Sequence, residues 1–180
     1  MNLLRSIVLS AIAAAIVTGT AIMSGYAQRG DLIVFPANYA KGVLYSTVDR
    51  ADLKQVRVLY ASSQAAIDAA KAGKPLPDGT VLTMVQYAAQ VDDKGVPLKG
   101  PNGRFVRTDK IVGYTVMEKR AGWGKDVPDE IRNGDWQYQA FRADRTPNPK
   151  AVLANCFKCH KPLDKQDFVF TWEGLRTAAK

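Results

Sequence analysis

The stretch TVLTMVQYA at residues 80–88 follows the turn signal Pro77-Asp78-Gly79 and has the composition of a β-strand. Successive side chains of a strand point to opposite faces of its sheet. One face would carry Val81, Thr83, Val85 and Tyr87, and the other Leu82, Met84 and Gln86. Residues 80–88 therefore predict a strand that presents two different surfaces.

Further strand patterns flank this segment on both sides. Val56, Val58 and Tyr60 alternate within residues 55–60, and a similar alternation runs through residues 111–119. Trp136, Tyr138 and Ala140 repeat it in residues 135–141. Residues 122–134, which contain Gly122, Gly124 and Gly134, predict a loop instead.

The helical signals are short and lie around these strands. Ser62 or Ser63 would begin an Ala-rich helix that runs to Lys71. Asn148 before Pro149 predicts a helix start, and a last helix would cover residues 172–179. The predicted fold class is α+β, an antiparallel β-sheet body with short flanking helices.

Near the C-terminus lies the string Cys156-Phe157-Lys158-Cys159-His160. The pattern C-x-x-C-H attaches a c-type haem: each thiol forms a thioether with a haem vinyl group, and the histidine ligates the iron. A redox dithiol or half of a zinc site is the alternative. Zinc would need two more ligands, and His160 is the one histidine of the chain. We therefore predict one covalent haem c, held through Cys156 and Cys159 with His160 as proximal iron ligand.

The other side of the iron stays open to several interpretations. After removal of the predicted signal peptide described below, Met84 and Met117 are the remaining thioether candidates. Otherwise that position holds a lysine, water or nothing. A Met ligand would be typical of an electron carrier, whereas an open position would bind NO, CO or a small nitrogen compound.

The N-terminus has the pattern of a secretory signal peptide. Arg5 precedes an uncharged run at residues 6–23, and small residues lie at Gly25 and Ala27, before a cut after Ala27. A retained anchor would need about 20 apolar residues, and this run is short for that. We expect residues 1–27 to be the signal peptide and 28–180 to be a single haem domain, periplasmic and free of the membrane after cleavage.

The chain of 180 residues has a formal charge of +8. The basic residues are scattered rather than clustered, which disfavours a nucleic-acid partner. An acidic redox partner or a small anionic ligand suits this charge better.

Six strings in order make the sequence similar to the cytochrome P460 family, which includes the β-sheet cytochromes c′ called c′-β. They are Pro36-Ala37-Asn38-Tyr39, Val56-Arg57-Val58-Leu59-Tyr60, Pro77-Asp78-Gly79-Thr80-Val81, Val116-Met117-Glu118-Lys119, the haem motif, and Asp167-Phe168-Val169-Phe170-Thr171. The resemblance implies a five-coordinate haem on a small antiparallel sheet, in a homodimer. It also implies a pocket opposite His160 that is open to NO or hydroxylamine.

Two further residues come from this resemblance. P460 members have a lysine, covalently bonded to the haem, five residues after the glycine of the Gly-Thr-Val string, where this chain has Met84. Arg57 matches an arginine that lines the distal pocket in P460 members, and its guanidinium would be a donor for a bound anion. Core packing for Met84, and a surface or propionate-pairing position for Arg57, remain the simpler alternatives.

The leading hypothesis is a c′-β-like monohaem cytochrome that binds NO or a related small nitrogen ligand. A P460-type hydroxylamine or NO oxidoreductase that passes electrons to a soluble cytochrome is the first alternative. It would need a base, and Glu118 is one of several carboxylates that the sequence offers. A Met-ligated electron-transfer cytochrome is the second alternative.

Overall fold

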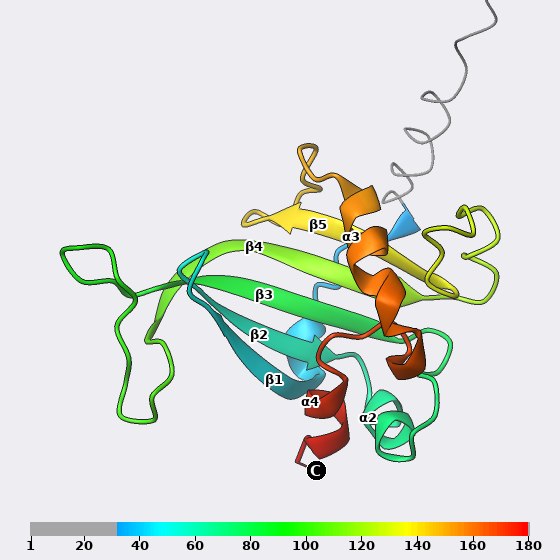
Figure 1. The fold of residues 1–180 in the computed structure, drawn as a ribbon, viewed down its shortest axis with the longest axis horizontal. Coiled ribbons are helices and arrows are strands. Elements are labelled where there is room, and N and C mark those ends of the chain that lie inside the picture. Colours follow the sequence, from blue (N-terminus) through cyan, green and yellow to red (C-terminus); the bar gives the residue numbers. More distant parts are fainter. Residues whose placement is uncertain (1–31, 180) are drawn as a thin grey trace, which may run out of the picture.

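The computed structural model describes residues 32–179 of the chain. The signal peptide predicted at residues 1–27 lies outside the described residues. Five strands form one antiparallel sheet in which each strand pairs with its neighbours in sequence (Figure 1). The strands are β1 (Val43–Arg50), β2 (Gln55–Ala61), β3 (Val81–Ala89), β4 (Arg107–Lys119) and β5 (Trp136–Arg142).

Short helices complete the fold. They are α2 (Gln64–Lys71), α3 (Leu153–His160) and α4 (Trp172–Thr177), with the 3₁₀ turns η2 (Tyr39–Lys41) and η3 (Lys161–Gln166). Figure 1 shows α3 and α4 on one face of the sheet, and the segment before β1, in blue and cyan, behind it. The predicted α+β class is confirmed.

The strand register divides the sheet into two faces, because paired residues of antiparallel strands point the same way. The face under α3, called the α3 face below, carries Arg57, Leu59, Leu82, Met84, Gln86, Thr115, Met117 and Tyr138. The opposite face, called the η2 face, carries Val58, Tyr60, Thr83, Val85, Tyr114, Val116 and Phe141. The two surfaces predicted for residues 80–88 are therefore confirmed.

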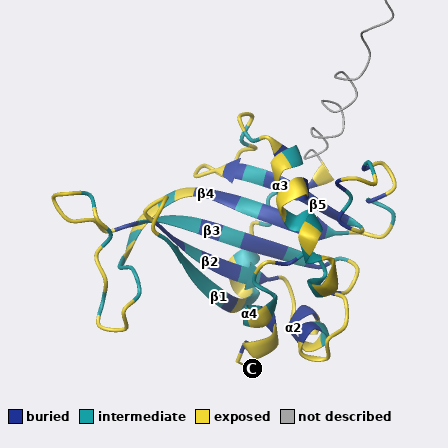
Figure 2. Cartoon of the chain, viewed as in Figure 1, coloured by how far each residue is buried: buried dark blue, intermediate teal, exposed yellow. Residues whose placement is uncertain are grey.

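Each face has its own apolar core. The larger core lies between the α3 face and the helices, and it buries Ile67 of α2, Trp136 of β5, Phe157 of α3 and Leu175 of α4. Full burial of one such side chain contributes about 2–3 kcal/mol. On the η2 face, Phe35 packs edge-on against Tyr114 and Phe141. Figure 2 shows buried residues along the middle strands and exposed ones on the helices' outer sides.

Two predicted helix boundaries were wrong. Helix α3 begins at Leu153 rather than at Pro149. The Asn148 side chain accepts from the Lys150 backbone N–H and forms a local turn, and Val152 has an extended ψ of 88° that prevents an earlier start. Helix α4 ends at Thr177 rather than at residue 179, because Ala178 is extended (ψ 134°).

The strand predictions were closer. The predicted strands at 55–60, 80–88, 111–119 and 135–141 correspond to β2, β3, β4 and β5, and the predicted loop at 122–134 separates β4 from β5. Strand β1 was not predicted. Among residues 32–179, no helix is long and apolar enough to cross a membrane.

Candidate functional site

Helix α3 presents both cysteines and the histidine to one space. Cys156 and Cys159 are three positions apart, which puts them on the same side of a helix. Both are free thiols, Cys156 partly buried and Cys159 exposed. Burial, and then the neighbouring Cys159, raise the pKa of the Cys156 thiol.

Phe157, between the two cysteines, anchors the helix. Its side chain is 2% exposed, and its ring packs edge-on against Tyr138 at 4.8 Å between centroids. The buried amide of Asn133 donates to the Phe157 carbonyl at 3.1 Å and to the Tyr138 hydroxyl at 2.8 Å. The C-x-x-C-H pattern leaves the residue type at Phe157 open, and the structure shows that this residue holds α3 on the sheet.

The imidazole of His160 is held by its Nδ1 atom. Nδ1 lies 2.6 Å from the backbone oxygen of Phe168. A carbonyl oxygen only accepts, so Nδ1 carries the proton and Nε2 is left as the lone-pair nitrogen. Burial lowers the pKa of His160, and the hydrogen bond to Phe168 opposes this in part. The neutral ring is the form that ligates a metal.

A cavity of about 470 Å³ lies between α3, the α3 face of the sheet and residues 169–171. Its walls include all five residues singled out in the sequence: Cys156, Cys159, His160, Met84 and Arg57. Met117 also lines it. Met84 is thus neither remote from the motif nor simply buried in the core. The volume is in the range of small-molecule and cofactor sites.

The sheet wall of the cavity is largely apolar, with Leu59, Leu82 and Met84 beside Met117. Among the described residues that line it, none is Asp or Glu. Glu118, the carboxylate considered as a base, lies on the η2 face, 8% exposed, with its Oε1 2.7 Å from Arg120 Nε. The alternation of side chains along a strand explains this, because Glu118 follows Met117 and so points to the other side of the sheet.

Two guanidinium groups are the charged part of the lining. Arg50 is held by Asp52, with nitrogen–oxygen distances of 2.8 and 2.6 Å. Arg57 donates from Nε to Gln55 Oε1 at 3.3 Å, and no carboxylate of residues 32–179 lies within ion-pair distance of it. Burial, and then the charge of Arg50, lower the pKa of Arg57. Arg57 is therefore a half-buried cation with donors left for another group.

These residues fit a haem of the c type. The cavity offers largely apolar walls for a flat macrocycle, two thiols on one side of a helix, and an imidazole whose Nε2 is left for the iron. A hydrogen bond from Nδ1 to a backbone carbonyl is the usual support of a metal-ligating histidine. Arg50 and Arg57 are the cations of the lining that suit anionic groups.

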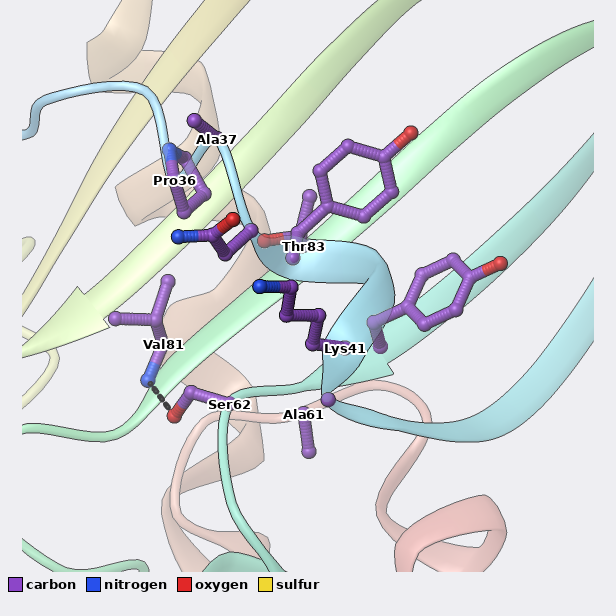
Figure 3. Close-up of a pocket in the computed structure, with 11 residues that line it drawn as sticks. Pro36, Ala37, Lys41, Ala61, Ser62, Val81 and Thr83 are labelled. Carbon is purple, nitrogen blue, oxygen red and sulfur yellow. Dashed lines mark hydrogen bonds between the residues drawn. The ribbon is translucent and has the colours of Figure 1, made fainter.

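A second hollow, of about 360 Å³, opens on the η2 face near residues 36–42. Figure 3 shows Lys41, Ser62 and Thr83 around it, with Ser62 Oγ accepting from the Val81 N–H at 3.0 Å. Its described lining contains no cysteine, histidine or arginine. The chemistry of the motif belongs to the larger cavity.

Some residues of the site were not found from the sequence. Tyr45 of β1 lines the cavity, and its hydroxyl is 2.9 Å from Thr171 Oγ1. Burial raises its pKa above the ordinary value, with the bond to Thr171 opposing. Lys119 and Asp167 form an ion pair of 2.9 Å beside the histidine's support. Lys119 and Asp167 each belong to one of the family strings, but nothing in either string indicates that the two residues form a pair.

No curated protein matches the chain. Residues 36–171 match the family described as cytochrome P460, and this range contains the cysteines, the histidine and every strand. Proteins of that family carry a c-type haem. The chain belongs to the cytochrome P460 family.

Proposed function

We propose that this chain is a monohaem c-type cytochrome whose distal side is open to NO or a related small nitrogen ligand. The haem is bonded to Cys156 and Cys159, and His160 is its proximal ligand. Bound there, the iron supplies a redox-active site for a diatomic molecule. The observation that carries the proposal is the cavity that joins these three residues to a largely apolar wall, which includes Met84.

The wall opposite the motif supports ligand binding rather than oxidation of hydroxylamine. A thioether cannot supply the amine that a lysine cross-link requires. Hydroxylamine oxidation also needs an acceptor for protons, and the described lining contains no carboxylate. Leu59 and Leu82 make this wall apolar and so disfavour water there. Arg57 supplies a hydrogen-bond donor that strengthens the binding of a ligand whose iron-distant atom carries negative charge.

One observation favours a second candidate, the Met-ligated electron carrier. Both Met84 and Met117 lie on the cavity wall, on neighbouring strands of the α3 face. A methionine sulfur bonded to the iron would raise the reduction potential and close the site to NO.

The optical spectrum of the ferrous holoprotein tests these candidates against each other. A broad five-coordinate spectrum at ordinary c-haem wavelengths, changed by NO, is expected. Sharp, split α and β bands would instead establish a sixth ligand, and a strongly red-shifted Soret band would establish a cross-linked haem. The variants Met84→Leu and Met117→Leu are matched controls, because each removes one sulfur at nearly constant volume. Neither should change the spectrum; loss of the split bands in one of them would identify the ligand.

The proposal also covers the location, the assembly and the redox partner of the protein. We infer export to the periplasm with cleavage after Ala27, assembly as a homodimer, and exchange of electrons with a soluble acidic partner. The mass of the secreted chain and its sedimentation velocity test the first two. A steep fall of the electron-transfer rate with rising salt tests the third.

A further inference from the structure

The backbone that supports His160 is strained at two consecutive residues. Asp167 and Phe168 have φ values of 50° and 62°. This left-handed region costs a residue with a side chain about 1 kcal/mol or more. A bulky residue such as Phe168 adopts it only where other contacts hold it there. Contacts from other parts of the chain must therefore hold this turn.

The Asp167 carboxylate is the centre of those contacts. Lys119 Nζ, at the end of β4, donates to Oδ1 at 3.0 Å and to Oδ2 at 2.9 Å. The backbone N–H of Leu76 donates to Oδ2 at 2.8 Å. The lysine and aspartate side chains are 16% and 10% exposed, so the pair is shielded from solvent. Segments far apart in sequence therefore meet on one carboxylate.

Phe168, the next residue, links this turn to the haem motif. The Phe168 N–H donates to the Leu163 carbonyl at 2.8 Å, and its own carbonyl accepts from His160 Nδ1 at 2.6 Å. The left-handed turn aims that carbonyl at the imidazole. Rotation of the turn at Asp167 would move the acceptor, whereas the histidine itself is fixed by α3.

We propose that Lys119 and Asp167 are positioning residues that set the strength of the His160–Phe168 hydrogen bond and through it the iron–histidine bond. The inference rests on the proposed haem site. A strong bond from Nδ1–H makes the imidazole a more basic ligand, which strengthens its bond to iron and favours the ferric state. The ion pair touches neither the haem motif nor its histidine, and it acts through one strained peptide.

The first test replaces Asp167 by Asn in the holoprotein. The shape is kept, but the carboxylate that joins Lys119 and Leu76 is lost. We expect the iron–histidine stretching frequency of the ferrous protein, measured by resonance Raman, to fall, and the midpoint potential of the haem to rise. The potential is measurable whether or not a sixth ligand is present, so it decides the inference in either state.

A second pair of variants covers the case in which D167N does not fold. Lys119→Met leaves the carboxylate without its cation, and Lys119→Arg restores a cation with two donors. K119M should shift both signals in the same direction as D167N, and K119R should return them to the wild-type values. Wild-type signals in K119M would overturn the inference.

Asp49→Asn is the matched control for stability. Asp49 accepts from Arg104 Nε at 2.7 Å and from the Phe105 N–H at 3.0 Å, so it also joins a cation and a backbone donor. Asp49 lies between the lining residues Val48 and Arg50 but pairs with Val56, so its side chain is on the η2 face and not in the cavity lining. D49N should lose stability without a change in stretching frequency or potential. Equal spectral shifts in D49N and D167N would mean a general loosening and would refute the positioning role. A colourless wild-type protein would refute the haem site instead.

Discussion

Met84 is paired directly with Leu59 across strands β2 and β3, and both side chains line the cavity that contains His160. The position that the resemblance to P460 members assigns to the cross-linking lysine is therefore on the cavity wall in this chain. We propose that the thioether at this position, rather than its distance from the motif, separates the chain from the cross-linked members.

Replacement of Met84 by Lys should consequently allow a covalent bond between the side chain and the haem when an oxidant is added. The new N–C bond replaces an N–H bond of the amine and a C–H bond of the haem, and the two electrons and two protons go to the oxidant, for which hydrogen peroxide is used. The lysine Nζ would enter a largely apolar cavity, where burial favours the neutral and nucleophilic amine. We expect a red-shifted Soret band and a haem peptide that contains both the residue 84 segment and the cysteines, detected by mass spectrometry after proteolysis.

Met84→Arg is the control for this variant. It brings a cation of similar length but no amine that can form the bond, because guanidinium stays protonated. M84R should give haem peptides from the cysteine segment alone. If M84K gives the same peptides as M84R, residue 84 does not correspond to the cross-linking position.

Arg57 and Arg50 should differ in their effect on anion binding. Arg50 is engaged by Asp52, whereas Arg57 has donors left on the cavity side. A hydrogen bond to a charged group contributes about 1.5–3 kcal/mol. Arg57→Gln should therefore raise the dissociation constant of ferric cyanide by about tenfold or more, measured by optical titration, and Arg50→Gln by clearly less. Equal effects would show that the two cations act only through the general field.

Much of the fold could be predicted from the sequence because strands β2 to β5 alternate regularly. Strand β1 could not, since its pairing with β2 shifts between Leu44 and Ser46 and interrupts the alternation. Leu44 is 54% exposed, while the next residue, Tyr45, is buried. The start of α3 was also wrong, because Asn148 caps a turn that the chain does not continue as a helix.

Some residues of the site could also be predicted from the sequence, and others could not. Cys156, Cys159 and His160 are recognisable because their chemistry needs a fixed local spacing, and Met84 and Arg57 because family strings mark their positions. The acceptor for His160 is a backbone carbonyl, which any residue could supply. Lys119 and Asp167 are 48 positions apart, and only the folded chain brings them together. Contacts of this kind have no local signal in the sequence.

The role of His160 can be separated from that of the cysteines. His160→Gly removes the imidazole and leaves both thiols, so we expect haem that is still covalently attached but lacks the five-coordinate histidine spectrum. Added imidazole should restore that spectrum by binding where the side chain was. Lys158→Ala, at an exposed position of the same helix, should have no effect. A wild-type spectrum in H160G without imidazole would refute the assignment of the proximal ligand.

The pair of Asp49 and Arg104 should make stability depend on pH in the acid range. The hydrogen bonds from Arg104 hold the pKa of Asp49 below its ordinary value of 3.8, with burial opposing. The unfolded chain then binds more protons than the folded chain between these two values, so the pair's contribution is complete above about pH 4–5 and is lost as the pH falls through the folded pKa. The side chains are 43% and 19% exposed, so we expect a coupling free energy of about 1 kcal/mol.

Urea unfolding of the wild type, D49N, R104Q and the double variant measures this coupling free energy. A coupling that is the same at pH 7 and pH 2.5 would show that the carboxylate is not the stabilising form.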